Sequence, residues 1–409
     1  MAAATVMGGI GFGRFAYTAI MPSMQEALGL SNTQTGLLAT WNAVGYMVAA
    51  LFAGVLASRF GPRVVVSVSA AVVGAAMVLT GFVEDFTLAF LLRAITGMGS
   101  AGIFVPVMGL LSAWFAPSRR GRATGVAVSG GSLGLAATGL LVPALIAAYG
   151  SLGWRVSWWL LGAITLVLAL LAYLLLRNHP DEKDLAPFGQ PASHEPADNG
   201  KPDASPLAWG LVYRSGALWR LSLVYFAFGF SSFLYATYFV KYLAKEGGFS
   251  QTEAGHLWAL VGIVAIASSF AWGMISDRRG RRFSLFWVLG LMAVSFLTFA
   301  LSRTASGYYL STLIYALTSQ SVPGIMAAAC GDYLGARLAP AALGLITFVL
   351  GIGLVLGPGV AGYLADLTGS LSPAFALAAV VAGAGALGAL LLRPPAHTEE
   401  ALPPVMAGE

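Results

Sequence analysis

Two arginines lie inside long apolar stretches of this sequence, where a charged side chain is costly. Arg14 lies roughly 14 Å along the first apolar run at a rise of 1.5 Å per residue, and Arg93 lies inside a run near 86–112. If these runs cross a bilayer, a central charge costs at least about 2.5 to 3.5 kcal/mol and usually faces a cavity or a partner. Each guanidinium could bind an anion through paired hydrogen bonds. For Arg14, a position at the membrane surface and a structural ion pair are the alternatives.

Polar and aromatic side chains accompany these arginines in the apolar runs. Tyr17 follows Arg14 by one helical turn and shares its face if the run is an α-helix. Asn42 and Tyr46 form an i, i+4 pair that could add a hydrogen-bonding wall. Helix packing, with the polar group satisfied by a neighbour, is the alternative for each of these residues. The remaining candidates for a binding site are Tyr235, Tyr238, Tyr315 and Gln320, with Lys241 as an interfacial cation near them.

The positions of the acidic residues narrow the chemistry, because none lies well inside an apolar run. A protein that expels cations would be expected to bury a carboxylate, whereas two buried arginines predict a positively charged site for a small organic anion. His256 is the candidate for proton coupling, and an exposed position at the membrane surface is its alternative. We expect no metal and no other cofactor, since Cys330 is the only cysteine and catalytic or phosphate-binding motifs are absent.

A duplicated string shows how the chain is organised. GVLASRFGPR at 54–63 recurs as GMISDRRGRR at 273–282, and further glycines keep the same offset in both copies. Each copy joins two apolar runs and has the glycines and arginines of a short cytoplasmic hairpin. Parallel halves related by duplication are typical of one class of secondary transporters. The expected units are a first half at 1–176, a cytoplasmic linker at 177–216, a second half at 217–393 and a cytoplasmic tail at 394–409.

Composition predicts an all-α integral membrane protein. Hydrophobic residues make up 58% of the chain and charged residues 10%, against about 25% charged residues in soluble domains. Most of the 22 Lys and Arg fall on one side of the apolar runs, so both termini are expected in the cytoplasm. The same bias accounts for the formal charge of +5, and no nucleic-acid partner is expected. The twelve predicted spans lie near 5–28, 36–57, 64–82, 86–112, 122–148, 154–176, 217–243, 254–276, 284–301, 306–331, 341–364 and 372–392.

These segments resemble the motifs of the major facilitator superfamily. The two hairpin strings resemble the family's loop motif, LLRAITGMGSAG at 91–102 resembles its fourth-span arginine motif, and GIGLVLGPGVAG at 351–362 resembles its glycine- and proline-rich motif. The opening string GFGRFAYTAIMPSM resembles the YbfB/YjiJ-like bacterial permeases. The first hairpin departs from the family pattern at Ser58, where an aspartate is usual, whereas the second keeps Asp277.

The resemblance implies two pseudo-symmetric halves of six helices, with spans 1, 4, 7 and 10 around a central cavity. It gives Arg93 a structural or proton-linkage role at least as readily as a contact with substrate, because the family motif carries this arginine across many substrates. It also implies a monomer in the inner membrane of a bacterium, in contact with the lipid bilayer. The residues to which it assigns gating are Arg59, Arg63, Asp277, Arg278 and Arg282.

The leading functional hypothesis is a secondary active transporter, and not an enzyme, that carries a small organic anion by alternating access. Its partners would be a small carboxylate-type substrate and a co-transported proton. A drug or metabolite exporter is the first alternative, favoured by the many aromatic residues and opposed by the lack of a buried acid. A membrane sensor that has lost transport is the alternative from another class.

Overall fold

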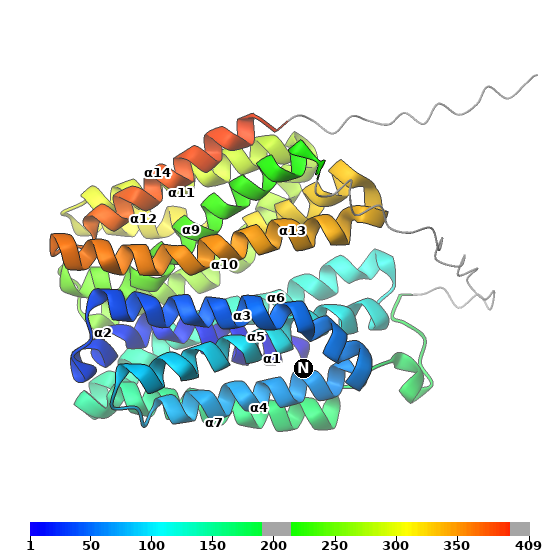
Figure 1. Cartoon of the computed structure of the whole chain (residues 1–409), viewed down its shortest axis with the longest axis horizontal. Coiled ribbons are helices and arrows are strands. Elements are labelled where there is room, and N and C mark those ends of the chain that lie inside the picture. Colours follow the sequence, from blue (N-terminus) through cyan, green and yellow to red (C-terminus); the bar gives the residue numbers. More distant parts are fainter. Residues whose placement is uncertain (190–213, 393–409) are drawn as a thin grey trace, which may run out of the picture.

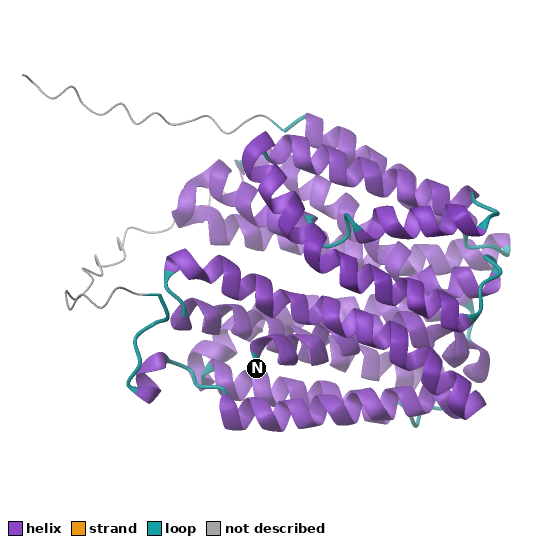
Figure 2. Cartoon of the chain, turned by 180° about the vertical axis from the view of Figure 1, so that it is seen from behind, coloured by secondary structure: helices purple, strands orange, loops and turns teal. Residues whose placement is uncertain are grey.

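The computed structural model describes residues 1–189 and 214–392. This part of the chain is helical apart from turns and loops, and it contains no strand beyond an isolated bridge between Phe115 and Phe188 (Figure 2). Most of the predicted linker and the whole predicted tail at 394–409 lie outside the described residues. The described helices form the twelve spans of the predicted fold, and the helices before residue 190 lie together on one side of the bundle (Figure 1).

The first half starts with a helical run that changes its hydrogen-bonding pattern twice. A π-helix, η1 (Met7–Phe15), is inserted between α1 (Ala2–Val6) and α2 (Ala16–Leu28). The other elements of this half are α3 (Asn32–Phe60), α4 (Pro62–Thr80), α5 (Phe86–Trp114), α6 (Pro117–Tyr149), the short 3₁₀ turn η2 (Gly150–Leu152), α7 (Gly153–Leu175) and η3 (Pro180–Lys183).

The second half repeats this order of long helices. Its elements are α9 (Gly216–Lys245), α10 (Gln251–Arg279), α11 (Arg281–Leu301), α12 (Ala305–Ala316), α13 (Val322–Thr368) and α14 (Ser372–Leu390). The duplication is visible in local structure as well as in sequence. Ser31 and Ser250 both close a capping box, at the start of α3 and of α10, and Gly61 and Gly280 both take a positive φ, of 84° and 89°, in the hairpins. Glycine adopts such a φ without the steric cost of a Cβ.

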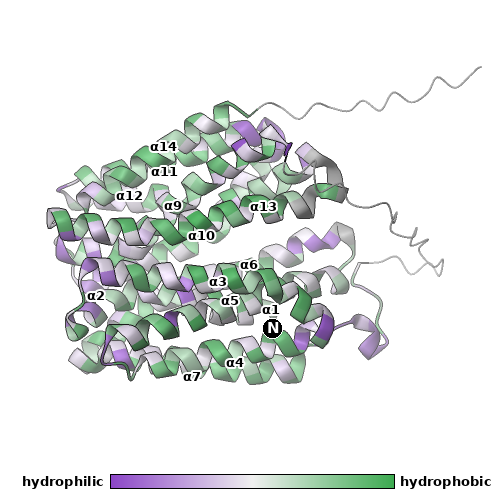
Figure 3. Ribbon diagram, viewed as in Figure 1, coloured by the Kyte–Doolittle hydropathy of each residue, from purple (hydrophilic) through white to green (hydrophobic). Residues whose placement is uncertain are grey.

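Nine helical stretches of the described chain are long and apolar enough to cross a membrane when each is judged alone. The other three predicted spans are interrupted or joined to a neighbouring span, so they are not counted separately. The π-helix divides the first span, η2 joins the sixth span to the fifth, and a turn divides the tenth span. Figure 3 shows apolar residues along the lengths of the helices. Large apolar side chains such as Leu51, Val380 and Leu391 are 63%, 68% and 68% exposed, which suits contact with lipid.

The tenth span differs from its predicted form. We predicted one span at 306–331, but α12 ends at Ala316 and α13 begins at Val322. Proline has no amide hydrogen and is tolerated in the first turn of a helix, so the helix restarts there. The predicted spans 306–331 and 341–364 are separated by residues 332–340, and α13 continues through this interval, because alanine, leucine and arginine are strong helix formers.

The two halves meet along stripes of small residues. A Cβ added to Gly36 on α3 would lie 2.3 Å from the carbonyl oxygen of Pro358 on α13. In the equivalent contact of α6 with α10, a Cβ on Gly255 would lie 2.3 Å from Cγ of Pro143. Small residues at helix crossings in membranes let two backbones approach closely. We call the end that carries Gly61 and Gly280 the hairpin end and the opposite end of the bundle the distal end.

Candidate functional site

Arg14 lies between the two halves with part of its guanidinium unused. The guanidinium carbon is 4.7 Å from the ring centroid of Tyr46 on α3 and 5.3 Å from that of Phe233 on α9. The side chain is partly exposed, yet Nε and Nη2 are buried and have no hydrogen-bond partner in the described structure. These two nitrogens form one edge of the planar fork, which matches the two oxygens of a carboxylate.

The charge of Arg14 is not neutralised by the described part of the chain. The ion pairs in the described structure involve His179, Lys245 and Arg281, and none involves Arg14. Stacking on aromatic rings offsets a cation's loss of water by about 0.5 to 2 kcal/mol for each ring, which is less than the cost of several kcal/mol for a buried unpaired ion. An anion bound to the free edge would remove the rest of this cost.

The π-helix explains how Arg14 reaches this position. A π-helix uses i→i+5 hydrogen bonds, and two of the carbonyl groups of η1 accept hydrogen bonds from side chains of α5. Ser100 Oγ donates to the Gly9 carbonyl at 2.7 Å, and Arg93 Nη1 donates to the Gly13 carbonyl at 2.7 Å. On the other side, a Cβ on Gly11 would lie 2.6 Å from Cα of Gly134. The glycine-rich run therefore packs tightly against α5 and α6 and fixes the residue that follows it.

Arg93 has a different environment from Arg14. It is 1% exposed, and its guanidinium carbon lies 4.7 Å from the Tyr17 ring and 5.7 Å from the Trp158 ring. Its hydrogen bond to the Gly13 carbonyl is made to the residue that precedes Arg14 in the π-helix. Asn42 donates from Nδ2 to the Arg93 carbonyl at 3.1 Å. This arginine is part of the interior of the first half.

Tyr17 is placed with Arg93 and not beside Arg14. Its hydroxyl donates to the Thr35 carbonyl at 2.8 Å, and its side chain is 2% exposed. The i, i+3 relation expected for an α-helix does not apply here, because the π-helix ends at Phe15 and shifts the faces of the residues before it. The ring of Phe15 packs edge-on against Trp258 of α10, at 6.3 Å between centroids. Trp258 Nε1 is another buried donor without a partner in the described structure.

Two of the predicted tyrosines lie inside the second half. The Tyr235 hydroxyl is 3.0 Å from Ser311 Oγ, and its ring is 4.4 Å from that of Tyr315. Tyr315 in turn shares a hydrogen bond of 3.1 Å with Ser232. Both tyrosines are buried in an aromatic cluster with satisfied hydroxyls, so they support α9 and are separate from Arg14. Gln320 lies in the turn between α12 and α13, where its carbonyl accepts a bond from a serine hydroxyl of α10.

At the distal end, α13 closes the start of α3 with a carboxylate from the other half. Asp366 Oδ1 accepts from the Asn32 amide at 2.9 Å, and Oδ2 accepts from the Thr33 amide at 2.7 Å and from the Thr33 hydroxyl at 2.5 Å. Tyr238 donates from its hydroxyl to the Asn32 carbonyl at 2.8 Å, and Lys241 Nζ donates to Asn32 Oδ1. We call these five residues the distal latch.

A weaker contact of the same kind joins α10 of the second half to α2 of the first half. Gln251 occupies the position in α10 that Asn32 occupies in α3. It donates from Nε2 to the Ala19 carbonyl at 3.2 Å and accepts from the Ser23 hydroxyl at 3.1 Å. Both of these contacts are neutral, and an exposed ion pair of 3.5 Å joins Lys245 of α9 to Glu26 of α2 at the same end. In the described part of the chain, no hydrogen bond or ion pair joins the hairpin ends of the two halves.

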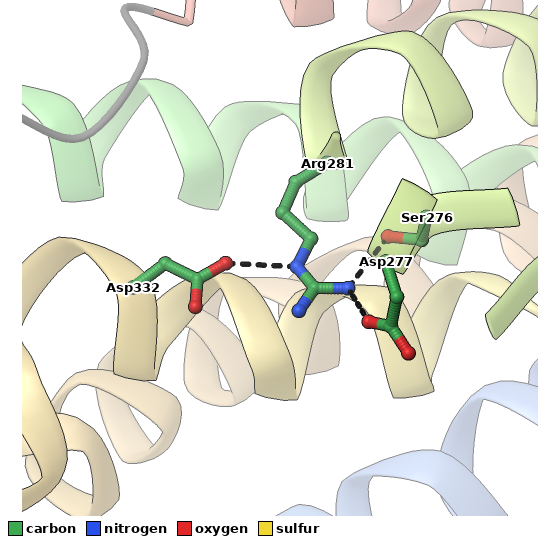
Figure 4. A network of polar contacts seen from close by, with 4 residues as sticks. All are labelled: Ser276, Asp277, Arg281 and Asp332. Atoms are coloured by element: carbon green, nitrogen blue, oxygen red, sulfur yellow. Dashed lines mark hydrogen bonds and ion pairs between the residues drawn. The ribbon is translucent and has the colours of Figure 1, made fainter. Parts of the chain in front are cut away.

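The hairpin of the second half carries an ionic network (Figure 4). Arg281 Nη1 donates to Asp277 at 2.5 Å and to Ser276 at 2.9 Å, and its Nε donates to Asp332 on α13 at 2.8 Å. The predicted gating residues Arg278 and Arg282 are both exposed. The residue that links the hairpin to α13 is therefore Arg281, which was not among the predicted gating residues. The i, i+4 spacing from Asp277 was the available signal.

The hairpin of the first half is held by different contacts. Arg63 donates from Nε to the Tyr173 carbonyl at 2.7 Å, and its amide donates to Asn178 at 2.8 Å. Arg59 lies over the ring of Phe60, at 5.4 Å from its centroid. The positions equivalent to Asp277, Arg281 and Asp332 are a serine, a proline and an alanine, so the ionic network has no counterpart here. His256 is exposed near the start of α10 and lies outside the arginine sites.

Comparison with known proteins agrees with this geometry. The family model for the Major Facilitator Superfamily matches residues 3–349. The chain belongs to the Major Facilitator Superfamily. Among solved structures of this superfamily's fold, a bacterial homologue of the human lysosomal transporter Spinster, in an inward-facing and occupied conformation, is similar with a TM-score of 0.73. The two chains are 18% identical, and the match covers 95% of this chain and 94% of the other.

Two relatives with names for what they carry are similar over most of their length. The chain is 27% identical to the "Probable sulfoacetate transporter" of Cupriavidus necator over 388 residues, which cover 91% of this chain and 88% of the relative. It is also 27% identical to the hexuronate transporter of Bacillus subtilis over 406 residues, which cover 94% and 93% of the two chains. This member of the superfamily is therefore a multi-pass membrane protein similar to named transporters along nearly its whole length.

Proposed function

We propose that this protein is a secondary active transporter of a small organic anion and that Arg14 pairs with the anionic group. The observation that carries the proposal is the free Nε and Nη2 edge of Arg14, buried between the halves without an acidic partner in the described structure. The names of the two relatives support the same substrate class, since sulfoacetate and hexuronates are both small organic anions.

The placement of Arg14 suits coupling between binding and movement. Arg14 and Tyr46 belong to the first half, whereas Phe233 belongs to the second. A substrate on the free edge would contact both halves, and its differential interaction with two conformations is what shifts their populations. The two halves rock about a midplane site in transporters of this architecture. We therefore place the substrate where the halves meet.

The number of available cations limits what the site recognises. Arg93 donates from Nη1 to the π-helix and is covered by two rings, although its Nε has no partner in the described structure. Because Arg93 is 1% exposed and Arg14 is partly exposed, we assign the substrate to the edge of Arg14. The neighbouring walls are aromatic, and Trp258 supplies a further unpartnered donor close to Phe15. The substrate class we propose is a compact anion bound through one carboxylate or sulfonate group, with a second hydrogen bond to the indole.

The distribution of basic residues indicates how the protein is oriented in the membrane. We propose that the hairpin end faces the cytoplasm of a bacterial cell, with both termini on that side of the inner membrane, because most Lys and Arg lie there. The contacts between the halves gather at the distal end, so this structure corresponds to a state closed to the outside. The distal latch would open when the site turns outward.

Uptake into proteoliposomes tests the proposed function. Purified protein is reconstituted and loaded with unlabelled carboxylates, sulfonates, neutral sugars or organic cations, and exchange of the matching labelled compound is measured. We expect exchange for at least one small carboxylate or sulfonate and a strong reduction with Arg14→Gln. Exchange of organic cations alone would contradict the proposal and favour an exporter. Gly54→Ala is the matched control, because a Cβ at Gly54 meets nothing within 4 Å.

A further inference from the structure

A cavity of about 620 Å³ lies within the first half at its hairpin end. The ends of α1, α5, α6 and α7 surround it, together with the segment that reaches Phe188. Apolar side chains such as Leu111, Trp114 and Leu176 form its walls. No residue of the second half lines it, so it is separate from the Arg14 site.

Three arginines lie at this cavity, and the residues that line it include no acid. Arg177 uses Nη1 for the carbonyls of the α7 end, at 2.8 Å. Arg119 and Arg122 are exposed, and no hydrogen bond or ion pair engages their guanidinium groups in the part of the chain described. An apolar cavity with free cations at one end suits an amphiphile that carries a negative headgroup.

The depth of the cavity points to a lipid as this amphiphile. α5 ends at Trp114 and α7 ends at Leu175, so the cavity lies at the level where the spans leave the membrane. Two of its lining residues, Val126 and Leu175, are 62% and 60% exposed, which extends the apolar wall to the lipid-facing surface. Basic pockets between transmembrane helices at the cytoplasmic side bind anionic lipid headgroups.

We propose that this cavity binds one acyl chain of an anionic phospholipid and that Arg119 and Arg122 hold its phosphate. The bound lipid would also contact the segment that leaves the first half. Phe188 donates from its amide to the Trp114 carbonyl at 2.8 Å, and its ring packs edge-on against Phe115 at 5.9 Å. The lipid thus fixes the path of the chain before it crosses to the second half.

Native mass spectrometry of the purified, delipidated full chain tests this site. Phosphatidylglycerol and phosphatidylcholine with identical acyl chains are added in equal amounts, and the ratio of the two bound lipids is measured. A basic side chain near anionic lipid is worth about 1 kcal/mol, which is roughly a fivefold preference per arginine. We expect the double variant Arg119→Gln/Arg122→Gln to lower the preference for phosphatidylglycerol by roughly 25-fold, and the double lysine variant to keep it.

Arg120→Gln is the matched control, because Arg120 lies in the same segment but does not line the cavity. It should leave the lipid ratio unchanged, and an effect equal to that of the double variant would overturn the proposal in favour of general surface charge. Ala123→Phe narrows the cavity and should reduce the amount of both lipids bound. Glycerol 3-phosphate is the probe for a site that needs no acyl chain. Displacement of the lipid by glycerol 3-phosphate at equal concentration would also overturn the proposal.

Discussion

Removing the carboxylate of Asp366 should open the distal end of the transporter. In Asp366→Ala, the amides of Asn32 and Thr33 lose the acceptor that α13 supplies across the interface. Losing a side-chain acceptor at a helix N-terminus costs about 0.5 to 2 kcal/mol. Asp366 is exposed, so solvent screening favours the lower part of that range. A loss of about 1 kcal/mol would change the ratio of open to closed molecules roughly fivefold.

Distances between two spin labels across the distal end measure this ratio. Ser151 and Ala305 are exposed positions at that end on opposite halves, and both become cysteines in a background where Cys330 is alanine. We expect Asp366→Ala to increase the longer-distance population about fivefold relative to the parent. Asp366→Asn should have a smaller effect, because asparagine is also a good cap.

Asp85→Ala is the matched control for this experiment. Asp85 caps α5 at the same end of the protein by accepting from the Leu88 amide at 3.0 Å, and both residues belong to the first half. Its removal should lower stability without changing the distance distribution. If Asp85→Ala and Asp366→Ala gave the same distribution, or if neither changed it, the distal latch would not control opening.

Three further substitutions test other parts of the structure. Arg93→Gln should lower stability in detergent by about 1.5 to 3 kcal/mol, because a buried ionic hydrogen bond is lost. It should weaken anion binding less than Arg14→Gln does. Equal losses of affinity in the two variants would contradict a positioning role for Arg93. Arg281→Ala should lower the free energy of unfolding by about 1 to 2 kcal/mol, because two carboxylates lose their partner. Arg278→Ala should change it by no more than about 0.5 kcal/mol. Denaturation curves that rank the two variants the other way would refute the role given to Arg281. Gly36→Ala should force the halves apart at the distal end, as seen with the same spin labels, whereas Gly54→Ala should not.

Much of the fold could be predicted from hydropathy and duplication, because both reflect local sequence. The duplication relates residues 31 and 250, and the structure gives these two serines the same capping box. The break in the tenth span and the helical course of 332–340 were missed. Whether a helix ends near a proline or continues through neighbouring strong helix formers depends on packing and on the exact position of the proline.

The site was less accessible from sequence, because its contacts join residues far apart in the chain. Arg14 became a candidate because a charge in an apolar run stands out, but its stacking on Phe233 depends on how the halves meet. The π-helix changed the partner of Tyr17, and periodicity gave no sign of it. Asp366 lies just after the predicted span at 341–364. Its contact with the start of α3 was not predicted, because local sequence does not show which helix of the other half it meets.

The affinity of a small carboxylate for the Arg14→Gln variant is the most direct test of the central claim. Isothermal titration of the purified protein, with a ligand chosen from the exchange experiment, measures it for the parent and for Arg14→Gln and Arg14→Lys. Losing an ionic hydrogen bond of about 1.5 to 3 kcal/mol predicts a roughly 10- to 150-fold weaker Kd for Arg14→Gln. The lysine variant should fall between, because it offers a point charge in place of a planar fork. An unchanged Kd in a folded Arg14→Gln protein would contradict the assignment of Arg14 as the substrate-binding cation.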